Sequence, residues 1–124
     1  MAGSNQQSVA RQTEQLALEH LQRNGLDLLE RNFRCRHGEI DLIMRDQATL
    51  VFVEVRFRKY SQYASAVASV DAHKQRRLCR AGSHYLRTHP HHCNTPVRFD
   101  VVAFDGPTQR DFTLQWLQDA FRPG

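Results

Sequence analysis

The stretch GEIDLIMRDQATLVFVEVRFRK, residues 38–59, contains two runs typical of neighbouring β-strands. Residues 39–45 form the first expected strand. Residues 49–57, which are rich in β-branched and aromatic side chains, form the second. A turn at Asp46-Gln47 joins them, and so short a connection favours an antiparallel pair.

The alternation of side chains assigns each residue of these strands to one face of the sheet. Both faces of the strand at 49–57 begin apolar, so we expect helices to cover the sheet on both sides. In this strand, one expected face consists of Leu50, Phe52, Glu54 and Arg56, and the other of Val51, Val53, Val55 and Phe57. In the earlier strand, one expected face consists of Ile40, Leu42 and Met44, and the other of Glu39, Asp41 and Ile43.

The rest of the chain supplies the helices and the remaining strands. A helical run ends at Gly25, a second helix ends before Pro90, and the second helix is expected to connect two parallel strands. The predicted architecture is an α/β fold with an α-β-β-β-α-β order, in which a mixed sheet is flanked by helices. The expected elements are helices at 8–24 and 67–88, strands at 26–36, 39–45, 49–57 and 97–104, and a closing segment at 112–121 that covers an edge or face of the sheet.

The composition is that of an ordinary globular domain with an excess of cations. The 124 residues suit one domain, 1–124, in which residues 1–7 form a flexible N-terminus. Lys and Arg total 17 against 13 acidic residues, which suits a polyanionic partner without requiring one. No stretch has the length of a membrane span, and the polar N-terminus is unlike a signal peptide, so we expect a cytoplasmic protein without a membrane partner.

The cysteines and histidines give little indication of a metal site. Three widely spaced cysteines, Cys35, Cys79 and Cys93, favour reduced thiols over a disulfide framework. The spacing in His89-Pro90-His91-His92-Cys93 is too crowded for a structural zinc site, and histidines in a loop are the favoured interpretation.

Two carboxylates occupy positions where apolar side chains are expected. Glu54 takes the place of another Val or Leu in its strand, and Asp41 lies on the adjacent strand. Because same-face side chains of adjacent antiparallel strands lie about 5 Å apart, the two acids can meet. Burial of a carboxylate costs several kcal/mol without a compensating partner, and a hard divalent cation such as Mg²⁺ or Mn²⁺ would compensate both. The alternative is that Glu54 pairs with Arg56 or another cation in a buried ion pair.

Three further residues are candidates for the same site. Glu39 follows the turn and is either a further ligand or a solvated strand end. Glu14 lies on the apolar side of the first helix and is either directed toward the sheet or a boundary residue. Lys74 precedes the apolar stripe of the second helix, where it reaches either the carboxylates or solvent. For Asp100, in the last strand, a structural hydrogen-bonding role is favoured over catalysis.

Basic residues supply a candidate track for nucleic acid. Arg31, Arg34 and Arg36 alternate along the first strand, although each such run is more often simply a solvated face. Their binding to phosphates would depend on salt and hardly at all on base sequence. The residues predicted to bind nucleic acid are Arg58 and Lys59 after the third strand, and Arg76, Arg77 and Arg80 on the second helix.

The sequence from Arg31 to Tyr60, RNFRCRHGEIDLIMRDQATLVFVEVRFRKY, resembles the YraN-like family of largely uncharacterised bacterial proteins. Glu14 with Ala17, Lys74 with Leu78, the string RFDVVAF from Arg98, and the segment from Trp116 to Phe121 extend the likeness over nearly the whole chain. The GEIDLI and VFVEVR pair at this spacing is its most specific part.

This resemblance implies the restriction-endonuclease-like, or PD-(D/E)XK, fold and a relation to Holliday-junction resolvases. It implies Asp41 and Glu54 as metal ligands, with the Val55 carbonyl as a third, and it matches Glu14 to a helix residue near the site. Arg56 stands where the superfamily signature has Lys. Arginine stays protonated and cannot act as a base, so we expect Arg56 to orient water or stabilise the phosphate, with Lys74 partly replacing the missing lysine.

We therefore expect a magnesium- or manganese-dependent phosphodiesterase that acts on DNA, with branched and single-stranded DNA as candidate forms and no organic cofactor. The expected catalytic residues are Asp41, Glu54, Arg56 and Lys74. The alternatives are a nucleic-acid-binding protein that keeps the nuclease fold without catalysis, and an interaction domain whose carboxylates are simply paired. Resolvase-like relatives act as dimers, which implies a homodimer, although no patch in the sequence specifies its interface.

Overall fold

The predicted hairpin is the centre of the fold. A computed structural model describes residues 4–59, 69–107 and 111–123, except for the side chains of residues 4–9 and 59. In it, β2 (Gly38–Asp46) and β3 (Thr49–Lys59) pair in antiparallel register from Asp46 opposite Thr49 to Leu42 opposite Val53. This register places Asp41 next to Glu54 at the point where the ladder ends.

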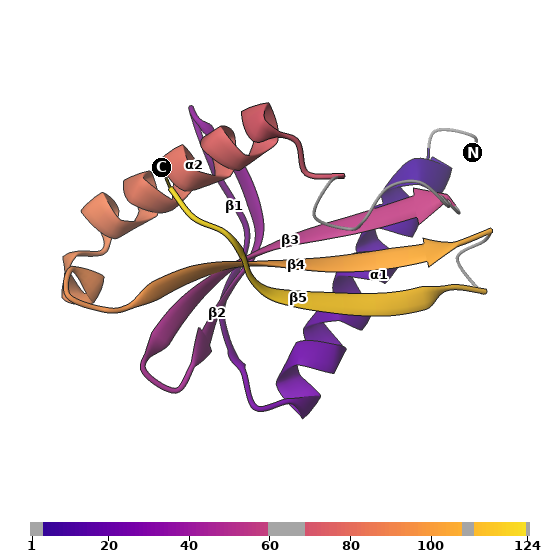
Figure 1. Cartoon of the computed structure of the whole chain (residues 1–124), viewed down its shortest axis with the longest axis horizontal. Helices are drawn as coiled ribbons and strands as arrows, with labels where there is room; N and C mark the ends of the chain where they lie inside the picture. Colours follow the sequence, from indigo (N-terminus) through magenta and orange to yellow (C-terminus); the bar gives the residue numbers. More distant parts are fainter. Residues whose placement is uncertain (1–3, 60–68, 108–110, 124) are drawn as a thin grey trace.

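Three further strands extend this hairpin into a five-stranded sheet with the order β1-β2-β3-β4-β5. β1 (Asp27–Cys35) pairs antiparallel with β2, and β4 (Val97–Gly106) pairs parallel with β3. The closing segment forms β5 (Thr113–Phe121), an edge strand antiparallel to β4. The predicted α/β class and mixed sheet are therefore confirmed (Figure 1).

Both helices differ from their predicted bounds at the N-terminal end. α1 (Ser4–Arg23) ends before Gly25 as expected, and the positive φ of 92° at Gly25 forms the helix stop. However, residues 4–7, which we expected in a flexible N-terminus, are helical. α2 (Ala72–Thr88) begins later than expected, because the Asp71 side chain caps it by accepting the Lys74 N–H at 2.8 Å. Residues 67 and 68 of the predicted helix lie outside the described part of the chain.

One helix covers each face of the sheet, as the two apolar faces of β3 predict (Figure 1). Leu50 and Phe52 pack beneath α2, whereas Val51 and Val53 pack beneath α1. The close approach of α2 depends on Gly82, because a Cβ there would lie 3.0 Å from the Phe52 ring. Within the described ranges, neither helix is long and apolar enough to span a membrane.

The predicted alternation of β2 is wrong at Ile40. Ile40 packs on the α2 side together with Ile43, whereas Leu42 packs on the α1 side. In a regular strand Ile40 and Leu42 would share a face, so the alternation breaks between them, at Asp41. The break coincides with Asn32 on the paired strand β1, which adopts a positive φ of 54°.

Asp100 has the structural role that the sequence favoured. Its side chain is fully buried and accepts hydrogen bonds from the Trp116 indole N–H at 2.9 Å and the Asp119 backbone N–H at 2.9 Å. Arg98 donates to the same carboxylate at 3.0 Å. Because the β4–β5 register shifts between Phe99 and Val101, Asp100 fastens the edge strand at its irregular point.

We predict that Asp100→Ala lowers the free energy of unfolding by about 3 kcal/mol, since it leaves a half-buried indole N–H, a backbone N–H and a guanidinium without their shared acceptor. Urea denaturation followed by circular dichroism measures this change. Asp27→Ala, at an exposed carboxylate, is the control and should cost less than about 0.5 kcal/mol. Equal losses in the two variants would contradict the role of Asp100.

Candidate metal centre

Where the ladder between β2 and β3 ends, the Asp41 side chain takes the place of a backbone carbonyl of β2 as hydrogen-bond acceptor. Its Oδ2 atom accepts the backbone N–H of Val55 at 2.8 Å, two residues beyond the last pair, Leu42 opposite Val53. A backbone N–H of a central strand needs an acceptor, and here a side-chain carboxylate provides it. This hydrogen bond fixes the Asp41 carboxylate against the middle of β3.

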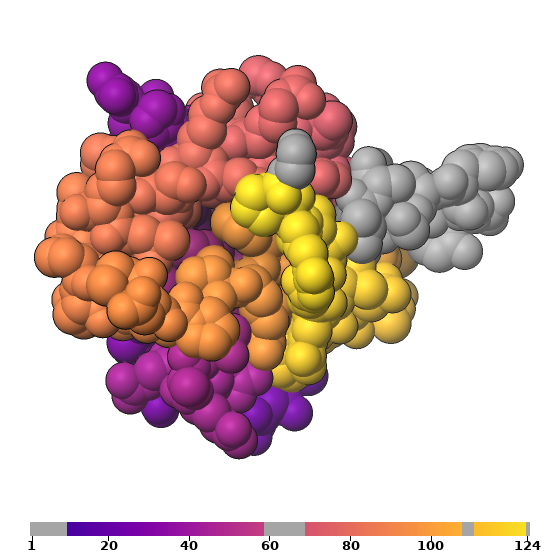
Figure 2. Space-filling view, turned by 60° about the vertical axis from the view of Figure 1, so that its left-hand side comes forward, coloured from indigo at the N-terminus to yellow at the C-terminus, as the bar shows by residue number. Residues whose placement is uncertain are grey.

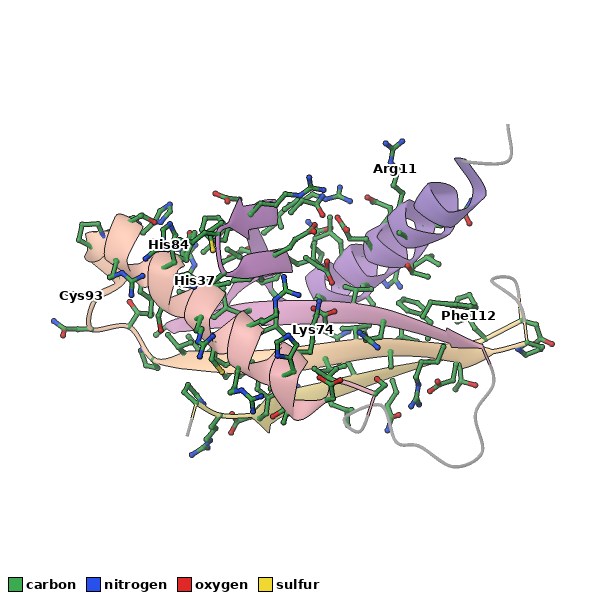
Figure 3. The ribbon with its side chains drawn as sticks, turned by 90° about the horizontal axis from the view of Figure 1, so that it is seen from above. Arg11, His37, Lys74, His84, Cys93 and Phe112 are labelled. Atoms are coloured by element: carbon green, nitrogen blue, oxygen red, sulfur yellow. The ribbon has the colours of Figure 1, made fainter. Side chains whose placement is uncertain are left out.

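Glu54 lies beside this point, on the face of the sheet that α2 covers. It follows Leu50 and Phe52 on that face, and the residue is only 5% exposed. Lys74 Nζ, from the first turns of α2, lies 3.7 Å from Glu54 Oε1, and Arg56 lies 3.9 Å from the same atom. Figure 3 shows Lys74 near the N-terminal end of α2. The structure thus brings Asp41, Glu54, Arg56 and Lys74 together, as the sequence predicts.

The two cations do not offset the electrostatic cost of the two acids. Burial, reinforced by the charge of Asp41, raises the pKa of Glu54 to about 8 although Lys74 and Arg56 oppose the shift. Burial also raises the pKa of Asp41 to about 6, against the effect of its hydrogen bond from Val55. The centre therefore favours added positive charge, either protons or a bound cation.

The supporting acids lie at the edges of this centre. Glu14 extends from α1, and its carboxylate is held by Arg31 at 3.3 Å and by the Asn32 amide at 3.1 Å. Glu39 lies 3.7 Å from Arg34 near the end of the hairpin, where 39% of its side chain is exposed. Both charges add to the rise in the pKa of Asp41.

The donor set, which consists of carboxylate oxygens, matches a hard cation such as Mg²⁺ or Mn²⁺ better than zinc. Among the described residues, no group of three His, Cys, Asp or Glu side chains is arranged to hold a metal. This includes His89, His91 and His92: the rings of His89 and His92 stack with Tyr85, and the His91 ring lies tilted against that of His92. Mg²⁺ needs only one or two protein carboxylates, since water and substrate phosphate supply its other ligands. Asp41 and Glu54 fit that requirement, and the Val55 carbonyl stays a predicted third ligand.

The predicted phosphate-binding residues divide into two groups. Arg76, Arg77 and Arg80 are exposed along α2. Arg58, by contrast, is only 12% exposed and forms a bidentate ion pair with Asp105 at 2.6 and 2.9 Å. Arg58 therefore fastens β3 to β4, because the ion pair uses the guanidinium face that phosphate would need. The side chain of Lys59 lies outside the described residues.

Sequence analysis missed Asn32 and the acceptor role of Asp41. Asn32 holds Glu14 and adopts a left-handed backbone conformation that asparagine tolerates better than most residues. An asparagine within a predicted strand was the available signal for this irregularity. Nothing in the sequence marks the Val55 N–H as lacking a backbone acceptor, since that depends on where the ladder ends.

Comparison with known proteins places this centre within a family. Residues 13–104 match the family described as "Uncharacterised protein family UPF0102", and the matched range contains Glu14, Asp41, Glu54 and Lys74. A UPF0102 protein of Alcanivorax borkumensis is 50% identical over 117 residues, which cover 94% of each chain. A UPF0102 protein of Alkalilimnicola ehrlichii is 54% identical over 108 residues, 87% of this chain and 82% of its own. The chain therefore belongs to the UPF0102 family, the YraN-like family that its sequence resembles.

Proposed function

We propose that this protein is a divalent-metal-dependent phosphodiesterase that cleaves DNA. The observation that carries the proposal is that the buried carboxylate of Glu54 and the half-buried carboxylate of Asp41 lie together with a lysine from a neighbouring helix. Two acids and a lysine around one point are the groups that the restriction-endonuclease-like resemblance implies. Perturbed carboxyl pKa values at a site with convergent charges add support to a catalytic interpretation.

Each residue of the centre would have a separate role, set by its position. Asp41 and Glu54 would hold Mg²⁺ or Mn²⁺, which when bound neutralises phosphate charge and lowers the pKa of water. The hydrogen bond from Val55 keeps the Asp41 carboxylate oriented toward that position. Arg56, one third exposed, has its guanidinium beside Glu54 and stabilises the charge that develops on the phosphate.

Lys74 answers the main objection to catalysis. The signature lysine is absent because Arg56 takes its place, and arginine cannot exchange a proton at neutral pH. Lys74 reaches Glu54 from α2 at 3.7 Å, slightly closer than Arg56 at 3.9 Å. An ammonium group is therefore present at the centre, supplied by a helix in place of the strand.

We predict that the protein nicks or cuts DNA in Mg²⁺ or Mn²⁺ and that Asp41→Asn and Glu54→Gln each reduce the rate at least about 100-fold, since each removes a direct ligand. Gel assays over linear, flapped, single-stranded and four-way DNA measure the rate and the preferred form. Asp27→Asn, the same chemical change at an exposed carboxylate, should retain the wild-type rate. Full activity in either centre variant would refute the assignment.

A second prediction separates catalysis from binding alone. Lys74→Met should lower the cleavage rate about 100-fold, and adding Arg56→Lys should restore part of it, because the new ammonium lies at the signature position. The binding-only alternative is motivated by Arg56. This alternative would be supported if the wild-type protein binds DNA in a salt-dependent manner and cleaves it in neither metal, and if the Arg56→Lys variant is also inactive.

The buried acids also predict how stability depends on pH. A carboxyl whose pKa is raised in the folded state binds more protons there, so stability is highest below its ordinary pKa and falls as the pH rises. For Glu54 that window runs from about 4.5 to about 8. In EDTA, Glu54→Gln should gain more than about 1 kcal/mol relative to wild type between pH 4.5 and 8.

Thermal unfolding over this pH range measures the effect, with and without Mn²⁺. The cation should raise the Tm of wild type at pH 8 and leave that of Glu54→Gln nearly unchanged, because a ligand that binds only the folded state stabilises it. A difference between the two proteins that does not vary with pH would contradict the electrostatic account.

A further inference from the structure

A concave site lies further along α2 from the candidate metal centre, between the β1–β2 turn and α2. The pocket has a volume of about 600 Å³, within the range of ligand-binding sites. Residues from two segments line it: Arg36 and His37 from the turn, and Cys79, Arg80, Ser83 and Arg87 from α2. We call this site the arginine pocket.

The arginine pocket concentrates positive charge without a nearby acid. Within the described ranges no carboxylate lines it, and α2 itself contains no Asp or Glu. Arg36, Arg80 and Arg87 therefore face the same space without a carboxylate among the lining residues to offset them. Desolvation, and then the charges of these arginines and of His84, lower the pKa of His37 at the rim. Such a pocket favours an anion, and guanidinium groups match phosphate oxygens in bidentate geometry.

The pocket is aligned with the metal centre along α2. Lys74 reaches Glu54, and one turn further on Arg77 donates to the His37 carbonyl at 3.3 Å. His37 and His84 then lie with ring centroids 6.0 Å apart. Figure 3 shows Lys74, His37 and His84 in succession along the length of the helix. One extended polyanion could thus contact both sites.

The cationic surface continues past the pocket on the other side of α2. A second pocket of about 320 Å³ shares Arg80 and Cys79 with the first and adds Arg76 and Arg122. Figure 2 shows the end of the chain, after β5, lying against α2 at this place. Because Arg122 is ion-paired with Asp119 at 2.6 Å, it is Arg76 and Arg80 that extend the positive charge beyond the arginine pocket along α2, which suits a polymer better than a small anion.

We infer that the arginine pocket binds a backbone phosphate of the DNA strand whose scissile phosphate lies at Asp41 and Glu54, an inference that rests on the proposed function. Ser83 lies nine residues beyond Lys74 on α2, or about 13 Å at 1.5 Å per residue. This distance is longer than the separation of adjacent phosphates in one strand, so the two contacted phosphates are at least two nucleotides apart. The pocket thus sets a minimum length of strand on one side of the cut.

The test measures binding without catalysis. Fluorescence anisotropy of the full chain in EDTA gives Kd for labelled DNA as a function of salt. The double variant Arg80→Ala/Arg87→Ala should weaken binding at least about tenfold and reduce the slope of log K against log salt by about 0.7 to 0.9, because one phosphate contact is lost. The matched control, Arg11→Ala/Arg23→Ala, removes two exposed arginines of α1 and should change Kd less than about threefold.

Two further experiments test whether one strand contacts both sites and whether the pocket prefers phosphates to carboxylates. Wild type should gain more affinity between oligothymidylates of three and eight nucleotides than the double variant does, because only the longer strand spans both sites. Polyglutamate with the same number of charges should compete poorly, since its carboxylates are spaced differently from phosphates. Equal effects of the double variant and its control would overturn the inference, as would an equal length gain or equal competition by polyglutamate.

The outcomes also distinguish this inference from the proposed function. The double variant should retain the Mn²⁺-dependent rise in Tm, which reports an intact fold and centre; loss of that rise would overturn the separation of the two sites. DNA binding through the arginine pocket by a wild type that cleaves in neither metal would support the pocket and defeat the phosphodiesterase. Cleavage by a double variant with wild-type affinity would defeat the pocket and leave the phosphodiesterase standing.

Discussion

The structure of the candidate centre depends on where one ladder of hydrogen bonds stops. β2 and β3 pair as far as Leu42 and Val53, and beyond that point the Asp41 carboxylate takes the Val55 N–H. A central strand cannot leave a buried N–H without an acceptor, so the carboxylate is held in place by the needs of the sheet. The same break reverses the side on which Ile40 packs and leaves Glu54 beside Asp41. The end of this ladder therefore determines both the packing of β2 and the position of the two acids in the candidate centre.

The energetic consequence is a pair of acids held in an environment that disfavours their charge. Lys74 and Arg56 approach Glu54 only to 3.7 and 3.9 Å, distances of ion pairs rather than of short hydrogen bonds. Asp100, by contrast, is fully buried and accepts hydrogen bonds from three donors within 3.0 Å, so its carboxylate is satisfied within the fold. The contrast distinguishes a carboxylate that stabilises the fold from a pair that costs stability and favours a cation.

Much of this arrangement follows from the sequence. The hairpin, the mixed sheet, the covering helices and the meeting of Asp41, Glu54 and Lys74 follow from periodicity and turn length, which are local properties. Three features do not follow from the sequence: the side on which Ile40 packs, the acceptor role of Asp41, and the pairing of Arg58 with Asp105. They depend on where a ladder ends and on which charges the folded strands bring together. The start of α2 at Ala72 does not follow from periodicity either, because the side-chain cap at Asp71 decides the boundary.

The most direct test of the account is the position of a bound cation. In ¹H–¹⁵N spectra of the full chain at neutral pH, substoichiometric Mn²⁺ broadens the amide signals nearest to it. The account predicts that the Val55 amide, whose N–H is bonded to Asp41, broadens first and that Asp41→Asn abolishes the effect. Broadening centred on His89 to Cys93, or none at Val55 as Mn²⁺ is raised to saturation, would contradict a cation shared by Asp41 and Glu54.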